Sequence, residues 1–174
     1  MTAENLPPFC LAGAPSPHAI GETIVTWTTP EEMAQGWEVV CQMYPDMSLE
    51  TYQQRLAEAL KRGYRQFACL SSQGRCLGVA GLWLFTRVWC GLQADIDTLV
   101  VDRNARSAGI GKRLLAACLE EARTHGARVA TLDTYVENID SHRFYHREGF
   151  AIRGYHFVKG LETADSINCH GRSS

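Results

Sequence analysis

One stretch decides the fold: Leu99-Val100-Val101-Asp102-Arg103-Asn104-Ala105-Arg106-Ser107-Ala108-Gly109-Ile110-Gly111-Lys112-Arg113-Leu114-Leu115. An apolar strand leads into a polar loop that ends in Arg-x-x-Gly-x-Gly-Lys and opens an amphipathic helix. Glycine lets the backbone turn sharply and leaves no Cβ to block a ligand. The first turn of a helix has unpaired N–H groups and the positive end of the helix dipole. The stretch therefore predicts an anion site at the start of a helix, with phosphate as the usual anion.

The spacing separates this loop from two other phosphate-binding loops. A P-loop requires Gly-x-x-x-x-Gly-Lys-Ser/Thr, but Arg106 stands at the first glycine position and Arg113 at the Ser/Thr position. The dinucleotide fingerprint Gly-x-Gly-x-x-Gly is disfavoured because its third glycine falls on Leu114 and the strand lies in mid-chain. On this motif alone, an ordinary strand-to-helix turn with surface arginines remains open.

A second motif follows a strand-like run over residues 129–136: Asn138-Ile139-Asp140-Ser141-His142-Arg143-Phe144-Tyr145-His146-Arg147-Glu148-Gly149-Phe150. Together the two motifs resemble the GNAT family of N-acetyltransferases, and the resemblance covers roughly residues 22–161. The alternative for Tyr145 is a helix aromatic that packs on the sheet, with Gly149 as the helix C-cap. We expect that packing role for Phe144.

The resemblance implies acetyl-CoA as co-substrate and no metal. In the family, the loop N–H groups hold the pyrophosphate, the Asn contacts the pantetheine arm, and the Tyr hydroxyl lies near the sulfur. Arg106 and Lys112 would add positive charge, and Arg103 and Arg113 either reach the remaining phosphate or form a solvated basic rim. The residues expected to bind the cofactor are Leu99, Val100, Val101, Arg106, Ser107, Ala108, Gly109, Ile110, Gly111, Lys112, Asn138 and Tyr145.

Acetyl transfer to an amine needs a base, because an amine with an ordinary pKa of about 10.4 is protonated at neutral pH. Asp95 and Asp97 are two residues apart in a predicted strand and should point to one face. The sequence does not decide which of them is the base, and both being merely solvated is the alternative. Tyr145 is the candidate general acid for the departing thiolate. Asp133, on the following strand, either lines the cleft or caps the strand end.

The acceptor pocket of the family would here include Tyr44, Trp83 and Asp133, which suit a small cationic amine. A local similarity to the aminoalkylphosphonate acetyltransferase branch leaves open a small zwitterion held by Arg143 or His156. A protein or peptide amine is a further alternative. From another functional class, a non-catalytic acyl-CoA-binding sensor or interaction module remains open.

Composition bounds the remaining expectations. A chain of 174 residues, 45% apolar and 21% charged, suits one soluble globular domain. The net charge of −2 and the lack of a long apolar run argue against nucleic-acid and membrane partners. Seven cysteines without C-x-x-C pairs indicate reduced thiols, a cytoplasmic protein and no zinc site. We expect a lead-in at 1–21, a single domain at 22–161 and a polar tail at 162–174; a monomer and a homodimer both remain open.

The expected fold class is α/β (α+β), a mixed and mostly antiparallel sheet with helices on both faces, in the order β-α-α-β-β-β-α-β-α-β. The expected helices run from Thr29 to before Pro45, over 48–60, from the glycine loop to His125-Gly126, and over 140–147. The expected strands cover residues 22–27, 65–71, 76–88, 92–101, 129–136 and 152–158.

Overall fold

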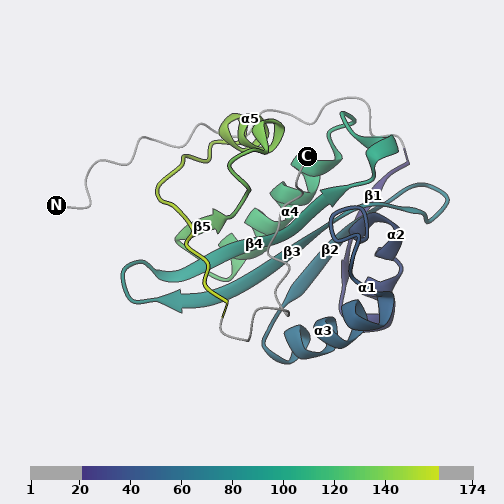
Figure 1. Cartoon of the computed structure of the whole chain (residues 1–174), viewed down its shortest axis with the longest axis horizontal. Coiled ribbons are helices and arrows are strands. Elements are labelled where there is room, and N and C mark those ends of the chain that lie inside the picture. The colour runs from purple at the N-terminus through teal and green to yellow at the C-terminus, as the bar shows by residue number, and fades with distance from the viewer. Residues whose placement is uncertain (1–20, 161–174) are drawn as a thin grey trace.

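A five-stranded sheet forms the centre of the computed structural model, which describes residues 21–160 (Figure 1). The strands stand side by side in chain order; β1 to β4 are antiparallel, and β5 is parallel to β4. This confirms the mixed, mostly antiparallel sheet predicted from the sequence. The strands are β1 (Thr23–Trp27), β2 (Arg65–Leu70), β3 (Cys76–Arg87), β4 (Gly91–Val101) and β5 (Val129–Leu132).

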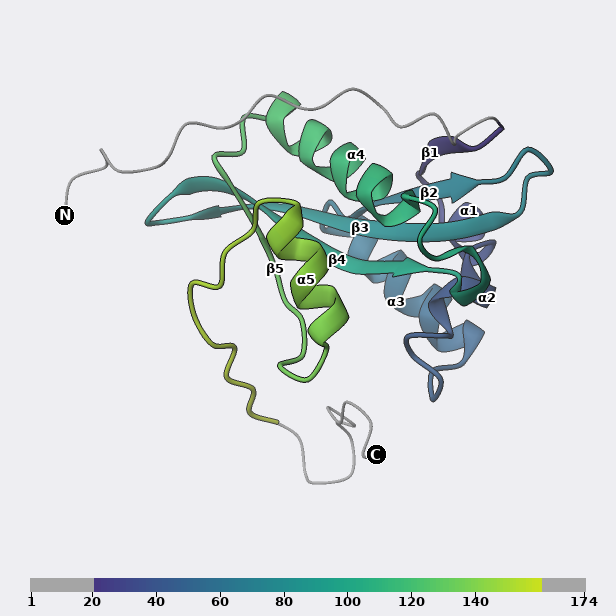
Figure 2. The ribbon, with the colours of Figure 1, turned by 90° about the horizontal axis from the view of Figure 1, so that it is seen from above.

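Helices cover both faces of the sheet, as predicted. Figure 2 shows the sheet between α4 on one side and α3 on the other, and Figure 1 shows α1, α2 and α3 grouped beside β1 and β2. The helices are α1 (Pro30–Ala34), α2 (Trp37–Val40), α3 (Leu49–Lys61), α4 (Ile110–Thr124) and α5 (Ile139–Arg147), with a short 3-10 helix η1 (Arg103–Ala105) before α4.

The prediction of a single helix from Thr29 to before Pro45 is wrong in one respect: the segment forms two short helices, α1 and α2. It begins as predicted, with a capping box between Thr29 and Glu32. It breaks before Gly36, where an added Cβ would lie 2.9 Å from the Trp27 ring and 3.0 Å from a Val79 methyl. Close packing of the backbone on β1 and β3 therefore takes priority over helical continuity.

Two apolar layers hold the sheet between the helices. The layer under α4 contains the predicted apolar face of that helix, Ile110, Leu114, Leu115, Cys118 and Ala122, all of them buried. The layer under α1 to α3 is separate and rich in aromatic side chains. Ala94 and Ile96 of β4 belong to the layer under α4. Asp95 and Asp97, which alternate with them, therefore lie on the face of β4 opposite to α4.

The expected sixth strand is wrong. Residues 151–160 form no strand, and β5 ends at Leu132 rather than at residue 136. The segment has apolar side chains on both of its alternating faces, and β5 offers it an edge of only four residues. Its one polar side-chain contact within the described residues is His156 Nδ1 to Asp133 Oδ2, at 2.7 Å. The expected lead-in, apart from Gly21, and the expected tail lie outside the described residues.

No helix within residues 21–160 has the length and apolarity needed to cross a membrane. The same residues contain no cluster of three or more His, Cys, Asp or Glu side chains suited to a metal ion. Cys69, Cys76 and Cys118 are buried free thiols, as predicted.

Candidate active site

A bulge in β4 creates the site. Gly81 of β3 faces Asp97, but Val79 faces Val100, so the two strands slip by one residue over Thr98 and the residue after it. Thr98 has a φ of +50°, in the left-handed region that a β-branched residue rarely adopts. Such local strain is frequent at functional sites.

Beyond the bulge, β4 has a free edge. Its pairing with β5 ends at Ile96 and Leu132, whereas β4 continues to Val101. Within the described residues, the edge that includes Leu99, Val100 and Val101 therefore has no strand partner on the β5 side. A free strand edge presents N–H and C=O groups that an extended ligand can pair with. Leu99, Val100 and Val101, which the sequence predicts to bind the cofactor, lie on this free edge.

The loop after β4 has the geometry of an anion site. Gly109, with φ +78°, precedes α4, and no side chain among the described residues caps that helix. Ser107 also has a positive φ, +65°. Arg106 and Lys112 are exposed and have no carboxylate within 4 Å in the part of the chain that is described. Helical N–H groups without a side-chain cap and two cations without a carboxylate partner thus belong to the same loop and helix start.

The remaining loop residues join α4 to the sheet and to α5. Ser107 and Ala108 are exposed, whereas Ile110 is buried in the apolar layer under α4. An added Cβ at Gly111 would lie 3.6 Å from both Phe144 of α5 and Val101 of β4. Phe144 therefore has the packing role predicted for it, and Gly111 lets α5 approach the loop closely.

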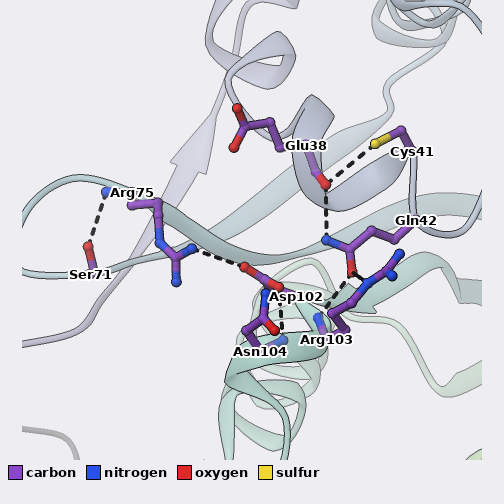
Figure 3. A network of polar contacts seen from close by, with 8 residues as sticks. All are labelled: Glu38, Cys41, Gln42, Ser71, Arg75, Asp102, Arg103 and Asn104. Atoms are coloured by element: carbon purple, nitrogen blue, oxygen red, sulfur yellow. Dashed lines mark hydrogen bonds and ion pairs between the residues drawn. The ribbon is translucent and has the colours of Figure 1, made fainter.

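A polar network holds the start of the loop in place (Figure 3). Asp102 is buried; its backbone N–H donates to Leu77 O at 2.9 Å, and its carboxylate accepts from Arg75 at 3.2 Å and from Asn104 N–H at 3.0 Å. The Arg103 N–H donates to Gln42 Oε1 at 3.0 Å, which ties the loop to the end of α2. Sequence reasoning missed this network, although an Asp at a strand end two residues before an Asn is a turn signal.

Arg113 does not behave as either sequence alternative suggested. Its Nη1 forms an ion pair with Glu22 Oε2 at 2.6 Å, and its Nη2 donates to Cys69 Sγ at 3.5 Å. Both charged side chains are less than a third exposed. Arg113 therefore fastens the first turn of α4 to the start of β1, and is neither a solvated rim residue nor directed at the loop.

On the opposite face, Asp97 lies in a polar cluster. Trp83 Nε1 donates to Asp97 Oδ2 at 3.4 Å, and Thr98 Oγ1 donates to Asp97 Oδ1 at 3.0 Å. The Tyr44 hydroxyl is 3.3 Å from Thr98 Oγ1. The structure therefore brings together Tyr44, Trp83 and Asp97, three of the residues selected from the sequence.

Asp95 shares that face, as predicted, because it faces Trp83 across the strands. Its Oδ1 accepts from Thr131 Oγ1 of β5 at 2.9 Å. Burial raises the pKa of Asp95, the Thr131 hydrogen bond partly offsets this, and the charges of Asp133 and Asp97 raise it further. A carboxylate with a raised pKa is better matched to proton transfer.

Buried aromatic side chains support the cluster from below. The Tyr64 ring is 5.0 Å from the Trp83 ring and lies over Gly81, where an added Cβ would overlap it. Burial raises the pKa of Tyr64 well above 10 and that of Tyr52 to about 12. Gln66 Nε2 donates to the Tyr52 hydroxyl at 3.0 Å. Only a glycine inside a strand hinted at this arrangement in the sequence.

The other selected residues lie apart from this cluster. Tyr145 on α5 contacts Phe144 and Phe150 edge to face, with ring centroids 5.2 and 6.0 Å away, and burial raises its pKa. Among the described residues, no hydrogen bond or ring contact joins it to either β4 carboxylate. Asn138 is the N-cap of α5 and accepts from Ser141 N–H at 3.2 Å. Asp133 is exposed and is paired with His156.

Comparisons with known proteins agree with this geometry. The model of the Acetyltransferase (GNAT) family matches residues 31–150. An uncharacterized N-acetyltransferase of Bacillus subtilis, YhdJ, is 31% identical over 134 residues, which cover 76% of this chain and 94% of that protein. An aminoalkylphosphonate N-acetyltransferase of Salmonella typhimurium is 28% identical over 138 residues, 76% and 88% of the two chains.

A solved structure shares the fold. The aminoglycoside N-acetyltransferase AAC(6')-Iy, determined in complex with CoA, superposes with a TM-score of 0.73 at 18% identity, over 84% of this chain and 99% of that one. Sequence and fold agree: the chain belongs to the GNAT family of acetyltransferases.

Proposed function

We propose that this chain transfers the acetyl group of acetyl-CoA to the primary amine of a small molecule, by direct attack of the amine on the thioester. The observation that carries the proposal is the bulge in β4. It places a free strand edge and an uncapped helix N-terminus on one side, and the Asp97 cluster on the other. The two substrates would thus meet across a single strand.

The donor would lie along β4 and end at the loop. The free edge at Leu99, Val100 and Val101 can pair with the amide groups of a pantetheine arm. The N–H groups around Gly109 and Gly111, with the free cations of Arg106 and Lys112, suit a pyrophosphate. The CoA complex of the aminoglycoside acetyltransferase supports the same class of donor.

The acceptor would enter on the opposite face. Asp97 is held by two hydrogen-bond donors and would attract the ammonium group of the acceptor. Asp95, with its raised pKa, would take the ammonium proton and release the lone pair for attack. A C–N bond then forms and the C–S bond breaks; the nitrogen releases its second proton to water, and the departing thiolate needs a proton. The Tyr145 hydroxyl, kept protonated by burial, would supply it.

Thiol release from acetyl-CoA, measured with a panel of primary amines, tests the proposal. Amine-dependent release supports it, whereas tight CoA binding without release from any amine indicates an acyl-CoA-binding module. In the carboxylate variants, Asp97→Asn should mainly raise the KM for the amine, and Asp95→Asn should mainly lower kcat. Glu120→Gln, an exposed change on α4, is the matched control. The same KM and kcat pattern in both aspartate variants would contradict the division of roles.

A further inference from the structure

A hollow of about 350 Å³ lies on the acceptor face, between α3 and β3. Arg55 and Glu58 line it from α3, Arg62 lines it from the position directly after α3, and Trp83 lines it from β3. The donor site and the proposed proton transfers use none of Arg55, Glu58 and Arg62. The hollow is therefore a feature that acetyl transfer alone does not explain.

Two of the residues that line the hollow, Arg55 and Arg62, are cationic. Within the described residues, the guanidinium groups of Arg55 and Arg62 have no carboxylate within 4 Å. Glu58 is engaged elsewhere, because its Oε1 accepts from Lys61 Nζ at 2.6 Å. The pKa of Glu58 is lowered mainly by that hydrogen bond and by the charge of Lys61, and less by Arg62. Two planar guanidinium groups thus remain available for an anion.

Trp83 connects this hollow to the Asp97 cluster. One side of the residue lines the hollow, and its indole Nε1 donates to Asp97. Trp83 is therefore shared by a position for a cation at Asp97 and a hollow whose lining offers two arginines to an anion. A short molecule with an ammonium group at one end and an anionic group at the other matches that arrangement.

We infer that the hollow is a subsite for the anionic end of the acceptor, with Arg55 and Arg62 as its ligands. The inference rests on the proposed acetyl transfer and narrows its acceptor to a short zwitterionic amine that ends in a phosphonate, phosphate, sulfonate or carboxylate. The two residues suggested from the sequence for this task are already engaged. Arg143 lies 3.4 Å from Asp140, and His156 lies 2.7 Å from Asp133.

The test compares acceptors of similar length. Purified full-length protein is assayed for thiol release with 2-aminoethylphosphonate, O-phosphoethanolamine, taurine and β-alanine, and with ethanolamine and propylamine as acceptors without an anion. The readout is the ratio of kcat/KM for each anionic acceptor to that for propylamine. Loss of one charge-assisted contact should lower this ratio about 10-fold in Arg55→Gln and in Arg62→Gln. Arg123→Gln, an exposed arginine on α4, should leave it unchanged.

Each outcome bears on the inference. A ratio that falls in both Arg55→Gln and Arg62→Gln and not in Arg123→Gln supports the subsite, and the acceptor with the largest fall identifies the anion. A ratio that does not change, or acetylation only of the amines without an anionic group, overturns the subsite and leaves acetyl transfer standing. If the wild-type protein acetylates no amine, the proposed function fails. Calorimetry with 2-aminoethylphosphonate then decides the subsite by itself: binding lost in Arg55→Gln/Arg62→Gln supports it, and no binding to wild type overturns it.

Discussion

The ion pair between Glu22 and Arg113 gives the most direct test of how α4 is fixed. Its atoms are 2.6 Å apart, and the two side chains are 22% and 27% exposed. Exposed pairs contribute about 0.2–1 kcal/mol, and removal of one partner of a fully buried pair costs about 3–5 kcal/mol. For this intermediate burial, we expect Glu22→Gln to lower the free energy of unfolding by about 1.5 kcal/mol.

That loss should be visible as a lower melting temperature. For a chain of this size, it corresponds to a decrease in Tm of roughly 3–6 °C. Arg113→Gln should cost a similar amount, and the double variant should cost much less than the sum of the two. Arg123→Gln, whose pair with Glu120 is more than 60% exposed on both sides, is the matched control and should shift Tm by less than about 2 °C.

The KM for acetyl-CoA distinguishes a structural role of the Glu22–Arg113 pair from a role of Arg113 as a ligand of the donor phosphates. Because Arg113 is committed to Glu22, the KM for acetyl-CoA should change by less than about threefold, and equally, in Glu22→Gln and Arg113→Gln. An increase of about tenfold in Arg113→Gln alone, without coupling in the double variant, would refute the reasoning. Arg113 would then contact the donor, which is one of the two alternatives that the sequence leaves open.

Three further predictions concern the two faces of β4. Tyr145→Phe should lower kcat by about 100-fold or more with little change in acetyl-CoA affinity by calorimetry, and equal turnover would remove Tyr145 from the mechanism. The pKa of Asp95 is raised in the folded protein, so its contribution to stability is present below the ordinary carboxyl pKa of 3.8 and is lost as the pH rises through the folded value. The melting temperature of Asp95→Asn relative to that of wild type should therefore rise between roughly pH 3 and pH 7. A difference in melting temperature that does not change with pH would count against the raised pKa. Gly81→Ala forces a Cβ to within 2.7 Å of two ring carbons of Tyr64 and should cost about 1–3 kcal/mol by urea unfolding; an unchanged midpoint would show that the ring can move away.

Local signals predicted most of the elements. The cap at Thr29, the cap at Ser48 and the apolar face of α4 all lie within a few residues of the structure they specify. The break at Gly36 could not be predicted in this way, because its cause is the approach of Trp27 and Val79. Local patterns also could not predict the length of β5. This strand ends at Leu132, close to the point where its partner β4 forms the bulge.

The site shows the same division. Spacing identified the glycine loop, and alternation placed Asp95 and Asp97 on one face. The groups that set their surroundings came from distant parts of the chain: Thr131 reaches Asp95 from β5, and Tyr44 reaches Thr98 from the segment after α2. Such contacts depend on strand order and register, which one sequence does not specify. The sequence also did not predict the ion pair of Arg113 with Glu22, which comes from the start of β1.

The hydrogen bonds from Arg103 to Gln42 have an evolutionary consequence. Gln42 links the donor loop to the segment that, two residues later, presents Tyr44 to the acceptor face. In the proposed mechanism, donor affinity and acceptor choice therefore depend on one short piece of backbone. A lineage that acquires a new amine through insertions or substitutions after α2 would also disturb its hold on the donor, so acceptor specificity can drift more freely through the side chains of α3 than through this segment.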